Sequence, residues 1–206
     1  MRSRASSLAA EDPGPKSGPE VPLSTVLLFE SGIGVVGLLI AWAFGIEIRL
    51  GRTDATALAA AAAGFAVLAA LFIVVVRVRW VPLQRINAKL SPILKTLFAG
   101  RSLGALLLIS VVAGVAEEIL FRGALQQIAE RYLSPAGAIV ATNVVFGLAH
   151  AITPAYAVLA FAMGVVLSVV LVVSDSLVAA AATHAVYDFF ALALYLRSRR
   201  GCPASK

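Results

Sequence analysis

Six ionisable residues in the second half of the chain lie within or beside long apolar segments, and their types and spacing indicate hydrolytic chemistry. They are Glu117, Glu118, Arg122, His150, His184 and Asp188. Ionisable side chains inside a membrane span are costly and usually serve a function. A carboxylate in a low-dielectric site can act as a general base near neutral pH. If the segments bundle around one water molecule, this set predicts hydrolysis of a bond that is drawn into the membrane.

The first group of these residues combines a paired and an unpaired carboxylate. Glu118 and Arg122 are four residues apart, so on a helix they share a face and can form an ion pair. Glu117 is rotated by about 100° from Glu118, which leaves its carboxylate able to serve as a base or a metal ligand. Taken alone, the pair of Glu118 and Arg122 is explained equally well as a structural ion pair.

The two histidines of the chain follow the same spacing rule. Phe146 and His150 are four residues apart with Asn143 on the same face, and His184 is followed four residues later by Asp188. Taken alone, the first set is explained by core packing and the second by a contact that locks a helix. Three such sets in three apolar segments favour one shared site.

The elements that must position these residues are membrane-spanning helices. The chain has 206 residues, of which 60% are hydrophobic and 14% charged, whereas soluble domains have about 45–50% and about 25%. This composition excludes a soluble enzyme, a disordered chain and a disulfide-rich secreted domain. The single cysteine, Cys202, cannot form an internal disulfide. The predicted fold class is all-α, a polytopic transmembrane helix bundle of about six spans.

The predicted spans and segments follow the apolar runs. The spans are expected at residues 24–44, 55–76, 103–132, 135–150, 154–173 and 176–196, the fourth being short for a span. The chain then divides into a disordered tail (1–22), two spans plus a basic cytoplasmic loop (23–102), a catalytic core of four spans (103–196) and a basic cytoplasmic tail (197–206). Within the loop, residues 77–101 carry no acid and contain Pro82 and Pro92, and a piece of it is expected to lie on the membrane surface.

The basic residues predict the orientation of the bundle. Ten of the 17 lysines and arginines lie in residues 77–101 and 197–206, which six spans place on one side. The positive-inside rule makes that side the cytoplasm, so both termini are expected there, in a multi-pass protein of a bacterial plasma membrane. The lipid bilayer is an expected partner, and no nucleic acid is expected.

Two further features of the first span carry no expected catalytic role. Glu30 lies near its start without a partner in sequence, so its carboxylate is expected to reach the membrane interface. Gly32, Gly34 and Gly37 fit the dinucleotide-binding pattern, but inside an apolar run they indicate close helix packing.

Three short motifs occur in order along the catalytic core. Residues 117–122 (EEILFR) match E-E-x-x-x-R, residues 146–150 (FGLAH) match F-x-x-x-H, and residues 184–188 (HAVYD) match H-x-x-x-N/D. Together they resemble the CPBP family of intramembrane endopeptidases, which includes the CAAX prenyl proteases and bacteriocin-processing or immunity proteins. The resemblance covers about residues 103–196, and the first two spans add nothing to it.

The resemblance implies a role for each motif residue. Glu117 would activate water and His150 would hold that water, while His184 and Asp188 would support the developing oxyanion. The pair of Glu118 and Arg122 would fix the helix and the base, with Phe146 and Asn143 as supporting residues.

Position 188 and the metal question stay open at this point. The prenyl proteases typically carry asparagine where this chain has Asp188, and an ionised aspartate cannot donate to an oxyanion. Asp188 would then be protonated, orient His184 or bind metal. Glu117, His150 and His184 could supply three zinc ligands with an open fourth position. Because no dedicated metal-ligand motif is present, a glutamate-activated water without a cofactor is favoured.

Three function classes are therefore compared. The leading one is an intramembrane endopeptidase that cleaves membrane-associated or lipidated peptides. The second is a non-catalytic relative that binds or sequesters a peptide, as an immunity protein does. The third, a proton- or metal-coupled transporter, is weakened because no internal repeat is detectable.

Overall fold

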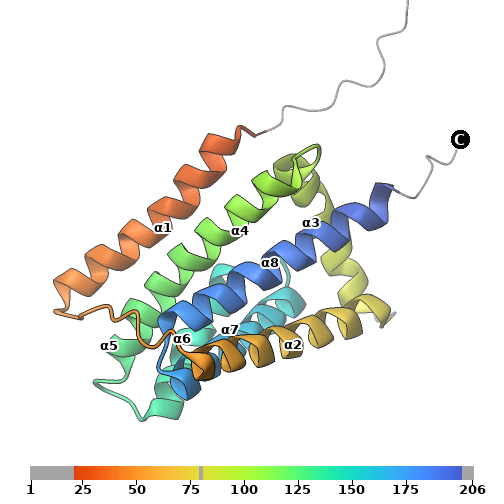
Figure 1. The fold of residues 1–206 in the computed structure, drawn as a ribbon. Helices are drawn as coiled ribbons and strands as arrows, with labels where there is room; N and C mark the ends of the chain where they lie inside the picture. Colours follow the sequence, from red (N-terminus) through yellow and green to blue (C-terminus); the bar gives the residue numbers. More distant parts are fainter. Residues whose placement is uncertain (1–20, 79–80, 201–206) are drawn as a thin grey trace, which may run out of the picture.

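The computed structural model describes residues 21–78 and 81–200, and within them every regular element is a helix (Figure 1). The elements, in chain order, are α1 (Leu23–Ala43), α2 (Ala55–Arg77), α3 (Val81–Phe98), α4 (Leu103–Glu118), the π-helix η1 (Ile119–Gln126), α5 (Gln127–Ala129), α6 (Pro135–Ala149), α7 (Pro154–Ser174) and α8 (Leu177–Arg200).

Five helical segments of the described chain are long and apolar enough to cross a membrane. They are Leu23–Ala43, Ala55–Arg77, Leu103–Ala129, Pro154–Ser174 and Leu177–Arg197. The remaining apolar helix, α6, has 15 residues and reaches about 22 Å, less than the hydrocarbon thickness of about 30 Å. The all-α transmembrane bundle is confirmed, with about six apolar helices as predicted, and the chain is a multi-pass membrane protein.

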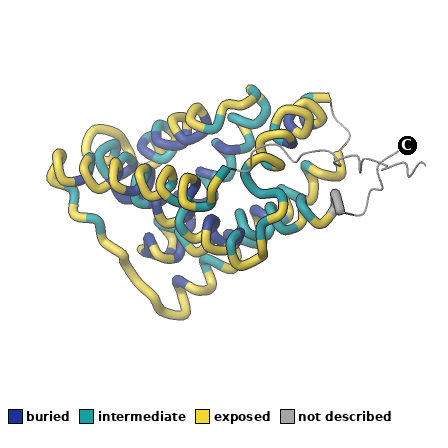
Figure 2. Tube along the Cα trace, turned by 90° about the horizontal axis from the view of Figure 1, so that it is seen from above, coloured by how far each residue is buried: buried dark blue, intermediate teal, exposed yellow. Residues whose placement is uncertain are grey.

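The burial pattern is that of a protein surrounded by lipid. Large apolar side chains such as Leu28 and Val173 are 72% and 66% exposed, whereas Ser110, Glu118 and Arg122 are at most 1% exposed. Figure 2 shows exposed residues along the outer faces of the helices and buried ones toward the interior. The polar residues therefore lie inside the bundle, where they can form a site.

Close contacts between α1, α4 and α8 set the register of the bundle. A Cβ placed on Gly34 would lie 3.2 Å from Ala116, and one on Gly37 would lie 2.7 Å from the Cα of Leu120. These glycines let α1 lie directly against α4, as predicted, and the two helices run in the same direction (Figure 1). Gly32 meets no neighbouring atom within 4 Å, so packing does not explain this third glycine.

The described ends of the chain and α3 lie at the same end of the bundle (Figure 1). A chain that crosses the membrane an even number of times has both of its ends on the same side. The predicted N-terminal tail falls almost entirely on residues outside the described range. At the other end, the predicted tail begins too early, because α8 continues to Arg200.

The predicted basic loop is mostly helix, which is a correction to the sequence interpretation. Helix α3 covers residues 81–98 and includes both prolines. Pro82 lies in the first turn, where a missing backbone N–H costs nothing, and Pro92 lies inside the helix. Apolar residues at helical spacing, including Leu83, Ile86 and Leu90, line an internal cavity. Burial of this face stabilises the helix despite Pro92.

Candidate active site

The helix that carries the first motif changes its winding at the motif. Helix α4 ends at Glu118, and the next eight residues form the π-helix η1. A π-helical turn inside an α-helix is rare and occurs frequently at functional sites. Here it follows directly on the two carboxylates and contains Arg122, which points into the bundle and is 0% exposed.

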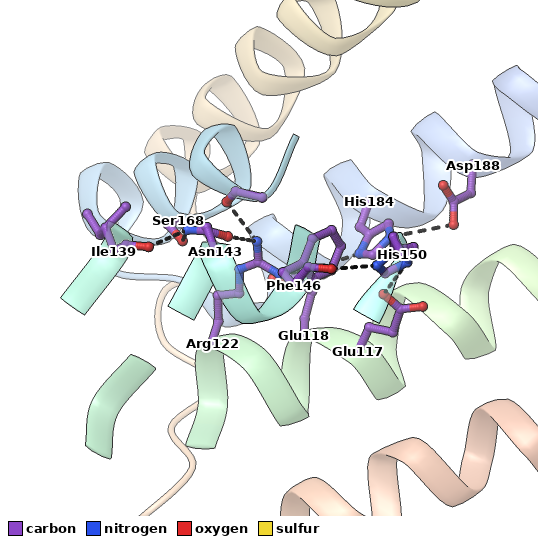
Figure 3. Close-up of polar contacts among 11 residues, drawn as sticks. Glu117, Glu118, Arg122, Ile139, Asn143, Phe146, His150, Ser168, His184 and Asp188 are labelled. Atoms are coloured by element: carbon purple, nitrogen blue, oxygen red, sulfur yellow. Dashed lines mark hydrogen bonds and ion pairs between the residues drawn. The ribbon is translucent and has the colours of Figure 1, made fainter. Parts of the chain in front are cut away.

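Arg122 is the centre of a buried hydrogen-bond network (Figure 3). Its Nη1 donates to Glu118 Oε1 at 2.9 Å, and its Nη2 donates to Asn143 Oδ1 at 2.9 Å and to the Gly164 carbonyl at 2.7 Å. The guanidinium carbon also lies 4.8 Å from the centroid of the Phe146 ring. One arginine thus joins η1 to α4, α6 and α7, and the four contacts offset the cost of burying its charge.

Asn143 extends this network into the wall of the bundle. Its amide nitrogen donates to the Ile139 carbonyl at 2.8 Å and contacts Ser168 Oγ at 2.9 Å. Asn143 is fully buried, so it acts as a fixed acceptor for Arg122. Ser168 was not singled out in the sequence, where its only signal is a hydroxyl inside the apolar run of α7.

His184 lies between two carboxylates from different helices. Its Nδ1 is 3.0 Å from Glu118 Oε1, and its Nε2 is 3.5 Å from Asp188 Oδ2. The side chain of His184 is 3% exposed. An imidazolium satisfies both contacts because both of its nitrogens carry a proton. The expected contact between His184 and Asp188 therefore forms within α8. The contact between His184 and Glu118 links α8 to α4.

His150 faces the other glutamate. Its Nδ1 lies 2.8 Å from the Phe146 carbonyl, which can only accept, so Nδ1 carries the proton. In the neutral imidazole Nε2 is then an acceptor, and it lies 3.7 Å from Glu117 Oε2. This distance exceeds that of a direct hydrogen bond. The Phe146 ring lies against the imidazole, with centroids 4.4 Å apart, and holds its orientation.

The histidines and Glu117 open onto one internal cavity of about 310 Å³. Its polar end is formed by Glu117, His150, His184 and Asp188, and its other walls are mostly apolar side chains from α2, α3, α7 and α8. The structure therefore brings the three predicted motifs together in one place. Glu118, Arg122 and Asn143 do not line the cavity; they lie behind it.

Two further residues of the cavity wall were missed or misread in the sequence. Glu30 was expected at the membrane interface, but it lines the cavity, and its Oε2 is buried without a hydrogen-bond partner among the described residues. Ser110, which also lines the cavity, precedes Glu117 by seven residues and therefore lies on the same helix face. That spacing is a signal that the sequence did contain.

The proposed zinc ligands do not form a metal site. Among the described residues, no three side chains of histidine, cysteine, aspartate or glutamate are placed to hold a metal ion. Both nitrogens of His184 face carboxylates, and His150 offers only Nε2. A zinc site needs at least three convergent ligand atoms, and the described side chains do not present them in this arrangement.

Comparison with protein families supports the same assignment. Residues 99–190 match the family model described as Rce1-like, type II CAAX prenyl endopeptidase Rce1-like. The match includes all three motifs, η1 and most of α8, and it leaves α1, α2 and α3 outside. Comparisons with curated proteins and with solved structures gave no match. Residues 99–190 are therefore similar to the Rce1-like family of type II CAAX prenyl endopeptidases.

Proposed function

We propose that the protein is an intramembrane endopeptidase that cleaves membrane-embedded or lipidated peptides with a water molecule activated by Glu117. The observation that carries this proposal is the placement of Glu117. Its Oε2 is buried and has no hydrogen-bond partner within the described part of the chain. It lies 3.7 Å from Nε2 of His150, and Glu117 borders the cavity. A carboxylate and an imidazole nitrogen so placed can each accept one hydrogen of the same water.

Such a water is held in a reactive orientation. Its two hydrogens point to Glu117 and His150, so a lone pair of its oxygen is directed away from both. Glu117 takes one proton as the oxygen attacks the carbonyl carbon of the peptide bond. The carbonyl oxygen becomes an oxyanion, and the C–N bond then breaks as the nitrogen receives that proton from Glu117. General-base assistance of this kind commonly contributes 10²–10⁴-fold.

His184 is the group best suited to stabilise the oxyanion. It lines the cavity, and its Nε2 faces Asp188 from 3.5 Å. The contact of Nε2 with Asp188 is long for a hydrogen bond, so the Nε2–H of an imidazolium can be shared with the oxyanion. In a low-dielectric site such a charged donor stabilises developing negative charge strongly. Asp188 then orients His184 by its charge. This assignment explains how aspartate serves at a position where the prenyl proteases typically have asparagine.

The buried network behind the cavity positions these groups. Glu118 accepts from both Arg122 and His184 through the same oxygen, so it fixes the imidazole relative to α4. The apolar cavity walls from α2 and α3 support a substrate with a lipid chain or an apolar peptide segment. The bilayer that surrounds the bundle would deliver such a substrate laterally.

Product analysis by mass spectrometry tests the proposal. The purified protein is incubated in liposomes with membrane proteins and lipidated peptides, and new peptide ends are identified for the wild type, Glu117→Gln and the exposed control Glu47→Gln. The proposal expects cleavage by the wild type and by Glu47→Gln, and its loss in Glu117→Gln. Peptide capture that survives in Glu117→Gln, without any product from the wild type, would instead identify a non-catalytic binder.

A further inference from the structure

One side of the cavity wall carries polar atoms that the proposed hydrolysis does not use. Glu30 and Ser110 both line the cavity, and neither Glu30 Oε2 nor Ser110 Oγ has a hydrogen-bond partner among the described residues. Ser110 is 1% exposed. An unsatisfied buried polar group costs about 1–3 kcal/mol, and in a native structure it calls for a specific explanation. A ligand that supplies the missing partner is such an explanation.

The helix register places both residues close to Glu117. Gly34 of α1 packs against Ala116 of α4 with the helices running in the same direction. Glu30 precedes Gly34 by four residues, so it lies about 6 Å from that contact, toward the start of α4. Its level is that of Ala113, which also lines the cavity. Ser110 lies on the same face of α4, about 10 Å before Glu117.

The charge of the cavity wall defines what can bind there. Among the described lining residues, the acidic and basic ones are three carboxylates, Glu30, Glu117 and Asp188, and two histidines. Three tyrosines complete the ionisable set, and no lysine or arginine is among these described residues. Glu30 interacts electrostatically with Glu117, Asp188 and His184. A substrate carboxylate at this level would meet like charges, and the imidazole of His184 is already engaged by the carboxylates of Glu118 and Asp188. An ammonium or guanidinium group would find acceptors in the carboxylates of Glu30 and Asp188 and in the hydroxyl of Ser110, and it carries donors for all of them.

We propose that Glu30 and Ser110, beside Asp188, form a subsite that binds the cationic side chain of a lysine or arginine in the substrate peptide. This proposal rests on the proposed endopeptidase function, because it places the cation next to the scissile bond. Glu30 and Glu117 are separated by about 7 Å along the bundle, which two residues of extended peptide span. The basic residue therefore lies within two positions of the cleaved bond. Glu30 is supplied by α1, outside the family match at residues 99–190.

Binding of a matched peptide pair tests the subsite without relying on turnover. The probe is an N-palmitoylated octapeptide of alanine and leucine that carries one lysine, and its counterpart carries norleucine, which keeps the apolar stem and removes the charge. Both are titrated into the full-length Glu117→Gln protein in nanodiscs, which cannot cleave them if Glu117 is the base. The lysine peptide is expected to bind about tenfold more tightly or better, the value of one charged hydrogen bond.

Variants of the wall assign that preference to its residues. Glu30→Gln, added to Glu117→Gln, should bring the two affinities together, and Ser110→Ala should reduce the difference in part. Glu47→Gln, at an exposed glutamate paired with Arg49, should leave it unchanged. Because Glu30 Oε2 has no hydrogen-bond partner to lose among the residues that the structure describes, Glu30→Gln should not lower the melting temperature. A structural role of Glu30 would lower it.

Three results would overturn the subsite: equal affinity for the two peptides, binding of neither, or a lysine preference that survives both Glu30→Gln and Ser110→Ala. Failure of the endopeptidase function is seen separately. It appears as the absence of any product from the wild type in mass spectrometry, whatever the binding titration gives.

Discussion

The Nδ1 atom of His184 lies 3.0 Å from Oε1 of Glu118, and this contact joins the first and the third motif across the packed faces of α4 and α8. The same oxygen accepts the Nη1 donor of Arg122 at 2.9 Å. One carboxylate oxygen therefore fixes a cation on η1 and an imidazole at the cavity wall. The two neighbouring glutamates therefore differ in their surroundings. Glu118 holds Arg122 and His184 in place, and Glu117 faces the cavity.

Replacing Glu118 should therefore reduce stability as well as activity. Glu118→Gln keeps the side-chain size but leaves the charge of Arg122 buried without its counter-charge. Breaking a buried ion pair from one side costs roughly 3–5 kcal/mol. The melting temperature in detergent should fall clearly, and product formation should fall with it because His184 loses its anchor.

Replacing Glu117 should instead reduce activity and leave stability unchanged. Glu117→Gln removes the proton-accepting charge, but Glu117 Oε2 has no hydrogen-bond partner among the described residues. Turnover should fall by about 10²–10⁴-fold while insertion and melting temperature are retained. If Glu117→Gln and Glu118→Gln destabilise the protein equally and both keep residual activity, Glu117 is not the base.

The sequence was sufficient for the motifs because the spacing rules of a helix act locally. The contact of Glu118 with Arg122 and that of His184 with Asp188 both follow from four-residue spacing. The contact of Glu118 with His184 spans 66 positions, and no local rule predicts which faces of two helices meet.

The positions of Glu30 and α3 also depend on contacts between helices, which the spacing of residues in the sequence does not give. In the sequence, Glu30 is a single acidic residue near the start of a helix. For such a residue the membrane–water interface is the position of lowest free energy. Its place in the cavity depends on the close packing of α1 on α4 at Gly34 and Gly37. Pro92 and the basic residues of α3 favour a loop in the sequence. The segment is a helix because its apolar face is buried against the cavity.

Metal chelators should leave the reaction unchanged. The donor atoms that face the cavity do not converge as three ligands, because both nitrogens of His184 are directed at carboxylates. Preincubation with EDTA or 1,10-phenanthroline, followed by the same product assay, should give wild-type rates. Loss of activity with recovery on addition of zinc would show that the side chains rearrange around an ion.

Gly164 should tolerate no side chain. Its carbonyl accepts from Arg122 at 2.7 Å, and an added Cβ would overlap Asn143 Oδ1 and crowd the guanidinium. Gly164→Ala should cost about 1–3 kcal/mol, as overpacking does, and should disturb Arg122. Gly32→Ala is the matched control, since nothing lies within 4 Å of that position, and in a helix it should stabilise by about 0.5–1 kcal/mol. Melting curves of the two variants measure the difference, and equal shifts would mean that the network adapts.

Asp188→Asn distinguishes the two roles open to position 188. The change keeps the shape of the side chain and removes its charge, and Asp188 Oδ2 faces His184 Nε2 from 3.5 Å. If Asp188 orients and supports a charged His184, the amide should lower kcat by about tenfold or more, the value of one hydrogen bond to a charged group. Substrate affinity for a neutral peptide should change little, because the loss concerns the transition state.

Asp188→Ala is the companion variant, and it should be at least as impaired. Wild-type or higher turnover in Asp188→Asn, together with loss in Asp188→Ala, would show instead that position 188 donates to the oxyanion, as an amide can and an ionised carboxylate cannot.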